Sequence, residues 1–135
     1  DLPQSPRQRI VTMWPFKTNS EKKMNYRKID ADFAAAGQIT PQQVGEVAAA
    51  GFKTIVCARP DGEDPGQPTF AAIERAAKDN GLKAVYIPIS GAIGEGALIR
   101  MEDALKKLPK PMFGYCRSGG RAGSLYGAAM QAARR

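Results

Sequence analysis

The chain has 135 residues, the length of one domain, and 43% of them are hydrophobic, enough for a buried core. It contains no histidine and only two cysteines, Cys57 and Cys116. This composition excludes Ser-His-Asp triads, Cys-His dyads and histidine metal sites, and it argues against a thiolate zinc site. We therefore expect no metal and no cofactor, and free thiols in a reducing compartment.

The formal net charge of +7 is distributed unevenly along the chain. Residues 1–30 contain seven basic and three acidic side chains, so more than half of the excess lies in this first segment. We interpret residues 1–25 as a flexible basic N-terminal extension and residues 26–135 as the catalytic domain. A basic tail without a patch on the folded part predicts no nucleic-acid binding. The absence of apolar spans predicts a cytoplasmic protein without membrane attachment.

The domain is expected to alternate strands and helices. In chain order, the patterns predict a strand at 33–36, a helix from about 40 to 50, a strand at 54–57, a loop at 59–68, a helix at 70–80, a strand at 83–87, a loop at 91–96, a helix at about 98–108, a strand at 112–115 and a helix from 122 to about 133. Thr40, Pro41 and Gln43 form a typical helix start with a capping box.

Four successive strand–helix units predict an α/β fold, in which a mostly parallel sheet of about four strands is flanked by helices on both faces. In such sheets, ligands bind where the strands reach their carboxyl ends. Cys116 directly follows the last predicted strand. The topology therefore indicates a binding site around Cys116.

The loop after this strand has the composition of an anion cradle around a nucleophile. Its sequence is Tyr115-Cys116-Arg117-Ser118-Gly119-Gly120-Arg121. The reactive form of cysteine is the thiolate, which backbone N–H groups, a helix N-terminus and nearby arginines all stabilise. Such a thiolate requires no histidine base. We predict Cys116 and Arg121 as catalytic residues, and the remaining predicted anion ligands are Arg117, Ser118, Gly119, Gly120 and Arg59.

The same loop resembles the active loop of rhodanese sulfurtransferases. Most of the folded part instead resembles the phosphatase-like domain of the beta-lactamase hydrolase-like proteins. The matching segments are 37–41, 50–55, 59–63, 65–68, 87–89 and the Cys116 loop. This resemblance implies the three-layer fold of dual-specificity phosphatases. It also implies a link to sulfide oxidation, because such domains are often fused to a persulfide dioxygenase.

Two chemistries fit this cradle, and the loop length bears on the choice. Protein tyrosine phosphatases place five residues between cysteine and arginine, whereas four separate Cys116 from Arg121 here. Those phosphatases also have histidine before the cysteine, where this chain has Tyr115. We therefore expect a sulfurtransferase that takes sulfur from thiosulfate or glutathione persulfide. The alternatives are a phosphatase acting on phosphate esters through a Cys116 phosphoenzyme, and a non-catalytic regulatory module that binds anions.

A phosphatase also needs a general acid to protonate the leaving oxygen. Asp61 and Glu95 are the possible acids, and Glu63 and Asp64 are further carboxylates of the loop at 59–68. The same Asp61–Asp64 segment is also typical of a simple turn. Cys57, within a predicted strand, is expected to be a buried core thiol, with a resolving thiol for Cys116 as the alternative.

Overall fold

The computed structural model describes residues 24–134, which form a five-stranded sheet between two layers of helices. In chain order the elements are β1 (Tyr26–Asp30), β2 (Phe33–Ala36), the 3₁₀ helix η2 (Pro41–Gln43), α1 (Val44–Ala49), β3 (Thr54–Cys57), α2 (Phe70–Asp79), β4 (Lys83–Tyr86), α3 (Glu95–Lys107), β5 (Met112–Tyr115) and α4 (Gly120–Ala133). The expected α/β class with a mostly parallel sheet is confirmed.

The strands lie in the order β1-β2-β5-β3-β4. β5 pairs in parallel with β2 on one side and with β3 on the other, and β3 pairs in parallel with β4. Only β1 is antiparallel, forming a hairpin with β2. β5 is therefore the central strand, and Cys116 follows its carboxyl end.

β1 was not expected, and the predicted four strands become five. Its five residues are all exposed and mostly polar, so they show no buried face from which a strand could be recognised. The chain turns back at Asp30–Asp32, where the Asp32 N–H donates to Asp30 Oδ1 at 2.8 Å, and β1 is a strand through its pairing with β2. The hairpin therefore adds an edge strand to an otherwise parallel sheet.

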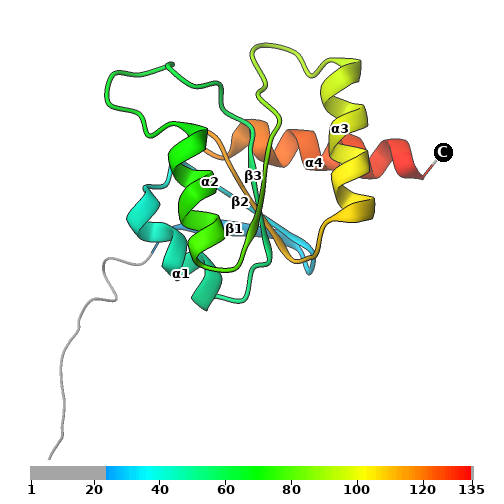
Figure 1. Cartoon of the computed structure of the whole chain (residues 1–135). Helices are drawn as coiled ribbons and strands as arrows, with labels where there is room; N and C mark the ends of the chain where they lie inside the picture. The colour runs from blue at the N-terminus through cyan, green and yellow to red at the C-terminus, as the bar shows by residue number, and fades with distance from the viewer. Residues whose placement is uncertain (1–23, 135) are drawn as a thin grey trace, which may run out of the picture.

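Two hydrophobic cores lie on the two faces of the sheet, as alternation along each strand requires. One contains buried residues of α1 and α2, and the other contains buried residues of α3 and α4. In β5 and its continuation, Phe113 and Tyr115 face the first core, whereas Met112 and Cys116 face the second. Figure 1 shows α1 and α2 on one side of the strands and α3 on the other.

The capping box at Thr40 and Gln43 forms as predicted, and further local signals set other helix ends. Gln43 Oε1 accepts the Thr40 N–H at 2.9 Å, and this first turn is 3₁₀ before α1 begins at Val44. Gly51 follows α1 with a φ of 101°, the left-handed conformation that glycine favours. Thr69 Oγ1 caps α2 by accepting the Ala72 N–H at 3.2 Å. Among the described helices, none is long and apolar enough to cross a membrane.

Gly114 of β5 allows an aromatic stack to pack across the central strand. The rings of Phe33 and Tyr126 are stacked with centroids 4.3 Å apart. A Cβ on Gly114 would lie 2.3 Å from Phe33 Cζ and 3.3 Å from Ala122 Cβ. Because Phe33 is 1% exposed, its ring has no free space into which it can move.

We predict that Gly114→Ala destabilises the fold by about 1–3 kcal/mol, the usual cost of overpacking a core. The free energy of unfolding in urea measures this change. Gly127→Ala is the matched control, because Gly127 lies in α4 with nothing within 4 Å of an added Cβ. That control should stabilise the protein by about 0.5–1 kcal/mol, since alanine favours a helix. Equal stability of the two variants would contradict the packing argument.

Candidate active site

The Cys116 loop is held in place by the two strands beside β5. The Cys116 N–H donates to Ala36 O at 3.2 Å, and the Ala58 N–H donates to Tyr115 O at 2.8 Å. Gly37 packs so closely that an added Cβ would lie 3.0 Å from Arg117 O. The loop thus begins from a rigid parallel ladder, and α4 starts four residues after the cysteine.

The Cys116 sulfur lies within a ring of backbone N–H groups. The Gly119 N–H donates to Cys116 Sγ at 3.0 Å. Gly119 has a φ of 99°, a left-handed conformation that glycine favours, and α4 begins directly after it. Burial acts to raise the pKa of Cys116, but hydrogen bonds from the N–H groups of Ala122, Ser118, Gly119 and Arg121 outweigh burial and lower it below the ordinary value. The loop therefore favours a thiolate.

Arg121 lies beside this sulfur, and its guanidinium is bound by the loop that follows β3. Its Nη2 and Nη1 donate to Glu63 Oε1 and Oε2, both at 2.8 Å. Nη1 also donates to Ile89 O at 2.9 Å. The pKa of Arg121 is raised, first by Glu63 and to a smaller extent by Cys116. The side chain of Arg121 is 26% exposed, so it remains accessible from solvent.

Arg59, which follows β3, joins the same group of charges. It is 3% exposed, and its Nε donates to Glu63 Oε1 at 2.8 Å. Its Nη1 donates to Gln38 Oε1 at 2.9 Å, and its Nη2 donates to Asp64 Oδ2. Every edge of this buried guanidinium therefore has a partner.

Glu63 is the acidic centre of the site, a role that sequence reasoning missed. Its carboxylate is shared between Arg121 and Arg59, and these hydrogen bonds lower its pKa to about 2. Sequence reasoning named Glu63 only as a further carboxylate of the loop. The signal for its actual contacts was the run Asp61 to Asp64, which sits directly after Arg59.

The two candidate acids lie in different surroundings. Asp61 Oδ1 accepts the Phe70 N–H at 2.8 Å, so this carboxylate helps to begin α2. This contact spans nine positions, and it is separate from the turn in which Asp61 and Gly62 lie. Glu95 is the exposed first residue of α3. Figure 1 shows the loop after β3 and the loop after β4 rising at the same end of the sheet.

Cys57 lies apart from Cys116 despite their neighbouring strands. Both cysteines are free, and they belong to the cores on opposite faces of the sheet. Cys57 is 2% exposed, and its thiol donates to Arg59 O at 3.3 Å. Burial raises its pKa, and hydrogen bonding with Tyr115 only partly opposes this. This placement supports a core thiol rather than a resolving thiol.

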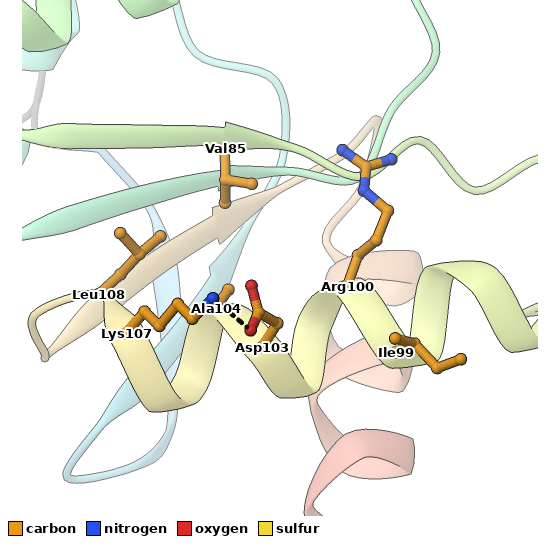
Figure 2. A pocket seen from close by; sticks show the side chains of 7 residues that line it. All are labelled: Val85, Ile99, Arg100, Asp103, Ala104, Lys107 and Leu108. Carbon is orange, nitrogen blue, oxygen red and sulfur yellow. Dashed lines mark ion pairs between the residues drawn. The ribbon is translucent and has the colours of Figure 1, made fainter.

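A groove of about 350 Å³ lies away from Cys116, between α3 and β4. Its lining residues are Val85, Ile99, Arg100, Asp103, Ala104, Lys107 and Leu108. Figure 2 shows the ion pair within it, in which Lys107 Nζ lies 3.1 Å from Asp103 Oδ1. Arg100 also donates to Tyr86 O. No cysteine, serine or threonine lines the groove, and within residues 24–134 no group of three or more acidic or cysteine side chains could hold a metal ion.

The fold and the cysteine loop define a class, the cysteine-dependent, phosphatase-like hydrolases. A protein named as a candidate phosphatase from Neisseria meningitidis Z2491 superposes with a TM-score of 0.70 at 30% identity, covering 78% of this chain and 75% of its own. Another such protein, from Shewanella putrefaciens CN-32, has a TM-score of 0.70 at 16% identity and covers 88% of this chain and 78% of its own, which shows the shared fold.

Residues 25–133 match the family described as "Beta-lactamase hydrolase-like protein, phosphatase-like domain", and the chain belongs to this family. The Beta-lactamase hydrolase-like protein of Agrobacterium fabrum C58 is 36% identical over 100 residues, which are 73% of this chain and 23% of that protein. The chain thus spans about a quarter of the curated relative that it matches. These relatives support the phosphatase alternative and give no support to the expected sulfurtransferase.

We predict that Cys116 titrates below the ordinary thiol value of about 8.5. Thiolate absorbance at 240 nm, measured as wild type minus Cys116→Ser, gives the midpoint directly. Gly119→Ala should raise this midpoint, because alanine resists the left-handed φ and its Cβ would lie 3.4 Å from the Ala36 backbone, so the loop that donates to the sulfur must shift. A midpoint at or above the ordinary value would contradict the N–H ring as the cause.

The same shift predicts how stability changes with pH. A folded-state pKa below the unfolded value means that the thiolate stabilises the fold fully above the unfolded pKa, and that this contribution is lost as pH falls through the folded pKa. The stability difference between wild type and Cys116→Ser should therefore grow as pH rises through this window. Thermal unfolding at a series of pH values measures it.

Proposed function

We propose that this domain hydrolyses phosphate monoesters, with the Cys116 thiolate as the nucleophile. The observation that carries the proposal is the sulfur at the end of β5, which accepts the Gly119 N–H at 3.0 Å within a ring of backbone donors. Such a ring stabilises the thiolate before reaction and holds phosphate oxygens during it. The small anionic substrate expected from the sequence agrees with this assignment.

The loop residues have separate roles in the proposed reaction. Backbone N–H groups hold the non-bridging oxygens of the phosphate around the sulfur, and Arg121 supplies a two-pronged contact to one side of it. Arg121 must first release Glu63, which occupies the two terminal nitrogens of its guanidinium. The residues assigned to anion binding are Arg117, Ser118, Gly119, Gly120 and Arg59.

The reaction has two steps. In the first, the Cys116 sulfur attacks phosphorus, an S–P bond forms, and the P–O bond to the alcohol breaks while the leaving oxygen takes up a proton. In the second, water attacks phosphorus, the S–P bond breaks, and inorganic phosphate leaves with Cys116 returned as a thiolate. Splitting hydrolysis in this way replaces one difficult step by two easier ones.

Asp61 is the carboxylate that we assign as the proton donor. Glu63 is poorly suited, because its two arginine partners lower its pKa to about 2 and keep it ionised. Glu95 lies at the exposed start of α3. Asp61 belongs to the loop whose Glu63 already contacts Arg121, and the one hydrogen bond described for its carboxylate uses Oδ1.

Sulfur transfer is the second candidate, and the four-residue spacing from Cys116 to Arg121 favours it. In that reaction Cys116 attacks the outer sulfur of thiosulfate, the S–S bond breaks and sulfite leaves. Cyanide or a thiol then removes the sulfur from the Cys116 persulfide. No proton donor is required, because sulfite is a good leaving group. A persulfide dioxygenase partner and glutathione persulfide as donor belong to this candidate alone.

The proposal also covers the bounds of the domain and its location in the cell. We assign residues 26–135 to the catalytic unit and residues 1–25 to a basic extension, nearly all of which lies outside the described residues. A cytoplasmic location fits two free thiols. A third possibility is a regulatory module that binds anions without turnover, and the absence of both phosphate release and sulfur transfer would indicate it.

We predict that the domain hydrolyses p-nitrophenyl phosphate and that Cys116→Ser lowers kcat by at least about a thousandfold. Cys57→Ser is the matched control and should retain activity, since Cys57 faces the opposite core. Intact mass measured after thiosulfate treatment should be unchanged. A gain of one sulfur that cyanide removes, without phosphate release, would instead establish sulfur transfer, and neither reaction would indicate a binding module.

We predict that Asp61→Asn slows phenyl phosphate hydrolysis by on the order of 100-fold and p-nitrophenyl phosphate hydrolysis much less. The poor leaving group needs a proton, whereas nitrophenolate leaves without one. Asparagine keeps the oxygen that accepts the Phe70 N–H, so α2 should retain its first turn. Glu95→Gln is the control and should change neither rate. Equal losses on both substrates would remove Asp61 as the acid.

A further inference from the structure

Five charged side chains form a continuous alternating chain beside the Cys116 loop. Glu63 links Arg121 to Arg59, with the contacting nitrogens and oxygens 2.8 Å apart. Asp64 continues the chain, accepting from Arg59 Nη2 and lying 3.4 Å from Arg117 Nε. Three guanidinium groups thus share two carboxylates, and the cluster keeps one net positive charge.

Arg59 and the two carboxylates differ in how far the fold encloses them. Arg59 is 3% exposed and is also fixed by Gln38, at 2.9 Å from its Nη1. The two carboxylates, in contrast, lie on the loop between Gly62 and Gly66. Both glycines have positive φ values, 81° and 78°, and an added Cβ at either would meet nothing within 4 Å. Arg59 is therefore the enclosed member of the cluster, whereas Glu63 and Asp64 are 29% and 41% exposed and lie on its solvent side.

We propose that Arg59 and Arg117 form a second anion subsite beside the Cys116 cradle, and that the substrates carry two neighbouring phosphate groups. In this arrangement, one phosphate binds the Cys116 loop and Arg121, and the other binds Arg59 and Arg117. Glu63 and Asp64 hold these two positions when substrate is absent. This substrate class rests on the proposed phosphatase function of Cys116.

The burial of Arg59 is the reason that we expect a substrate with one phosphate to bind less favourably than one with two. An arriving phosphate must displace Glu63 from Arg121, and the same oxygen of Glu63 also contacts Arg59. In the proposed bound state both carboxylates leave Arg59, which then keeps only its contact with Gln38, and a largely buried charge without an ionic partner is unfavourable. A second phosphate restores the lost pair, and it binds an arginine through two hydrogen bonds as a carboxylate does.

Arg117, the exposed arginine of the proposed subsite, can be reached by a ligand from solvent. The side chain of Arg117 is 69% exposed, and its ion pair with Asp64 is the longest contact in the chain, at 3.4 Å. It therefore loses little when Asp64 withdraws, because exposed ion pairs are weak. Arg117 is also the safest residue to replace, since its side chain contributes little to packing.

Binding of pyrophosphate and orthophosphate to the Cys116→Ser protein tests the proposal without turnover. Titration calorimetry at constant ionic strength should show pyrophosphate binding at least about tenfold more tightly. Adding Arg117→Ala should remove most of this preference, because pyrophosphate should lose more affinity than orthophosphate does. Asp64→Asn should tighten pyrophosphate binding, because it removes the charge that competes for Arg59 and Arg117.

Arg75→Ala is the control for general attraction to a basic protein, because it removes the same charge from the exposed surface of α2. Equal affinities for the two anions, or the same loss in Arg117→Ala and Arg75→Ala, would overturn the subsite. Turnover of p-nitrophenyl phosphate is measured separately on the Cys116 protein. A pyrophosphate preference without turnover would refute the phosphatase function alone, and turnover without the preference would refute the subsite alone.

Discussion

The parallel pairing of β5 with β2 and β3 is the constraint on which the site depends. Tyr115 lies opposite Ala36 on one side and opposite Cys57 on the other, so the three strands end together. The segments that follow them begin at Gly37, Ala58 and Cys116, and the ladder therefore brings three distant parts of the chain to one edge. Parallel sheets bind ligands at such edges for this geometric reason.

The same pairing gives the two cysteines opposite chemical characters. Side chains alternate across a sheet, and Cys57 and Cys116 consequently face different cores. Cys57 lies in an apolar core, where its thiol contacts Arg59 O, and its pKa is raised by burial. Cys116 is equally buried, at 1% exposed, yet it follows the strand and meets backbone N–H groups instead. Burial alone therefore does not decide thiol reactivity, since the donors around the sulfur reverse its effect.

Charge balance connects this edge to the loop after β3. The arginines near Cys116 would repel one another if they were left alone at close range. Glu63 and Asp64 neutralise most of that charge, and the shared contacts hold Arg121 and Arg59 in defined positions. The acidic run is therefore part of the anion site. An anion can bind there only by displacing these two negatively charged carboxylates from the arginines. That opposition underlies the proposal of a substrate with two phosphate groups.

The sequence predicted elements best where one local signal was strong. Buried β-branched residues marked Thr54–Cys57, an apolar run marked Met112–Tyr115, and both strands have the expected bounds. The polar strand β1 was not predicted, because its pairing with β2, rather than any apolar face of its own, makes it a strand. The loop from Cys116 to Arg121 was recognised because cysteine, glycine and arginine carry their chemistry in their identities. The hydrogen-bond partners of Arg121 could not be predicted from the sequence, because Glu63 is 58 positions away.

The sequence by itself thus determined the α/β class, the family resemblance and the loop in which a thiolate can form. These depend on periodicity and on residue type, both of which are local properties. The tertiary structure decided the strand order, the separation of Cys57 from Cys116 and the pairing of three arginines with two carboxylates. Those depend on which segments meet in space. The reason is physical: a charged or reactive side chain takes its properties from neighbours within a few ångströms, and folding, not sequence order, supplies them.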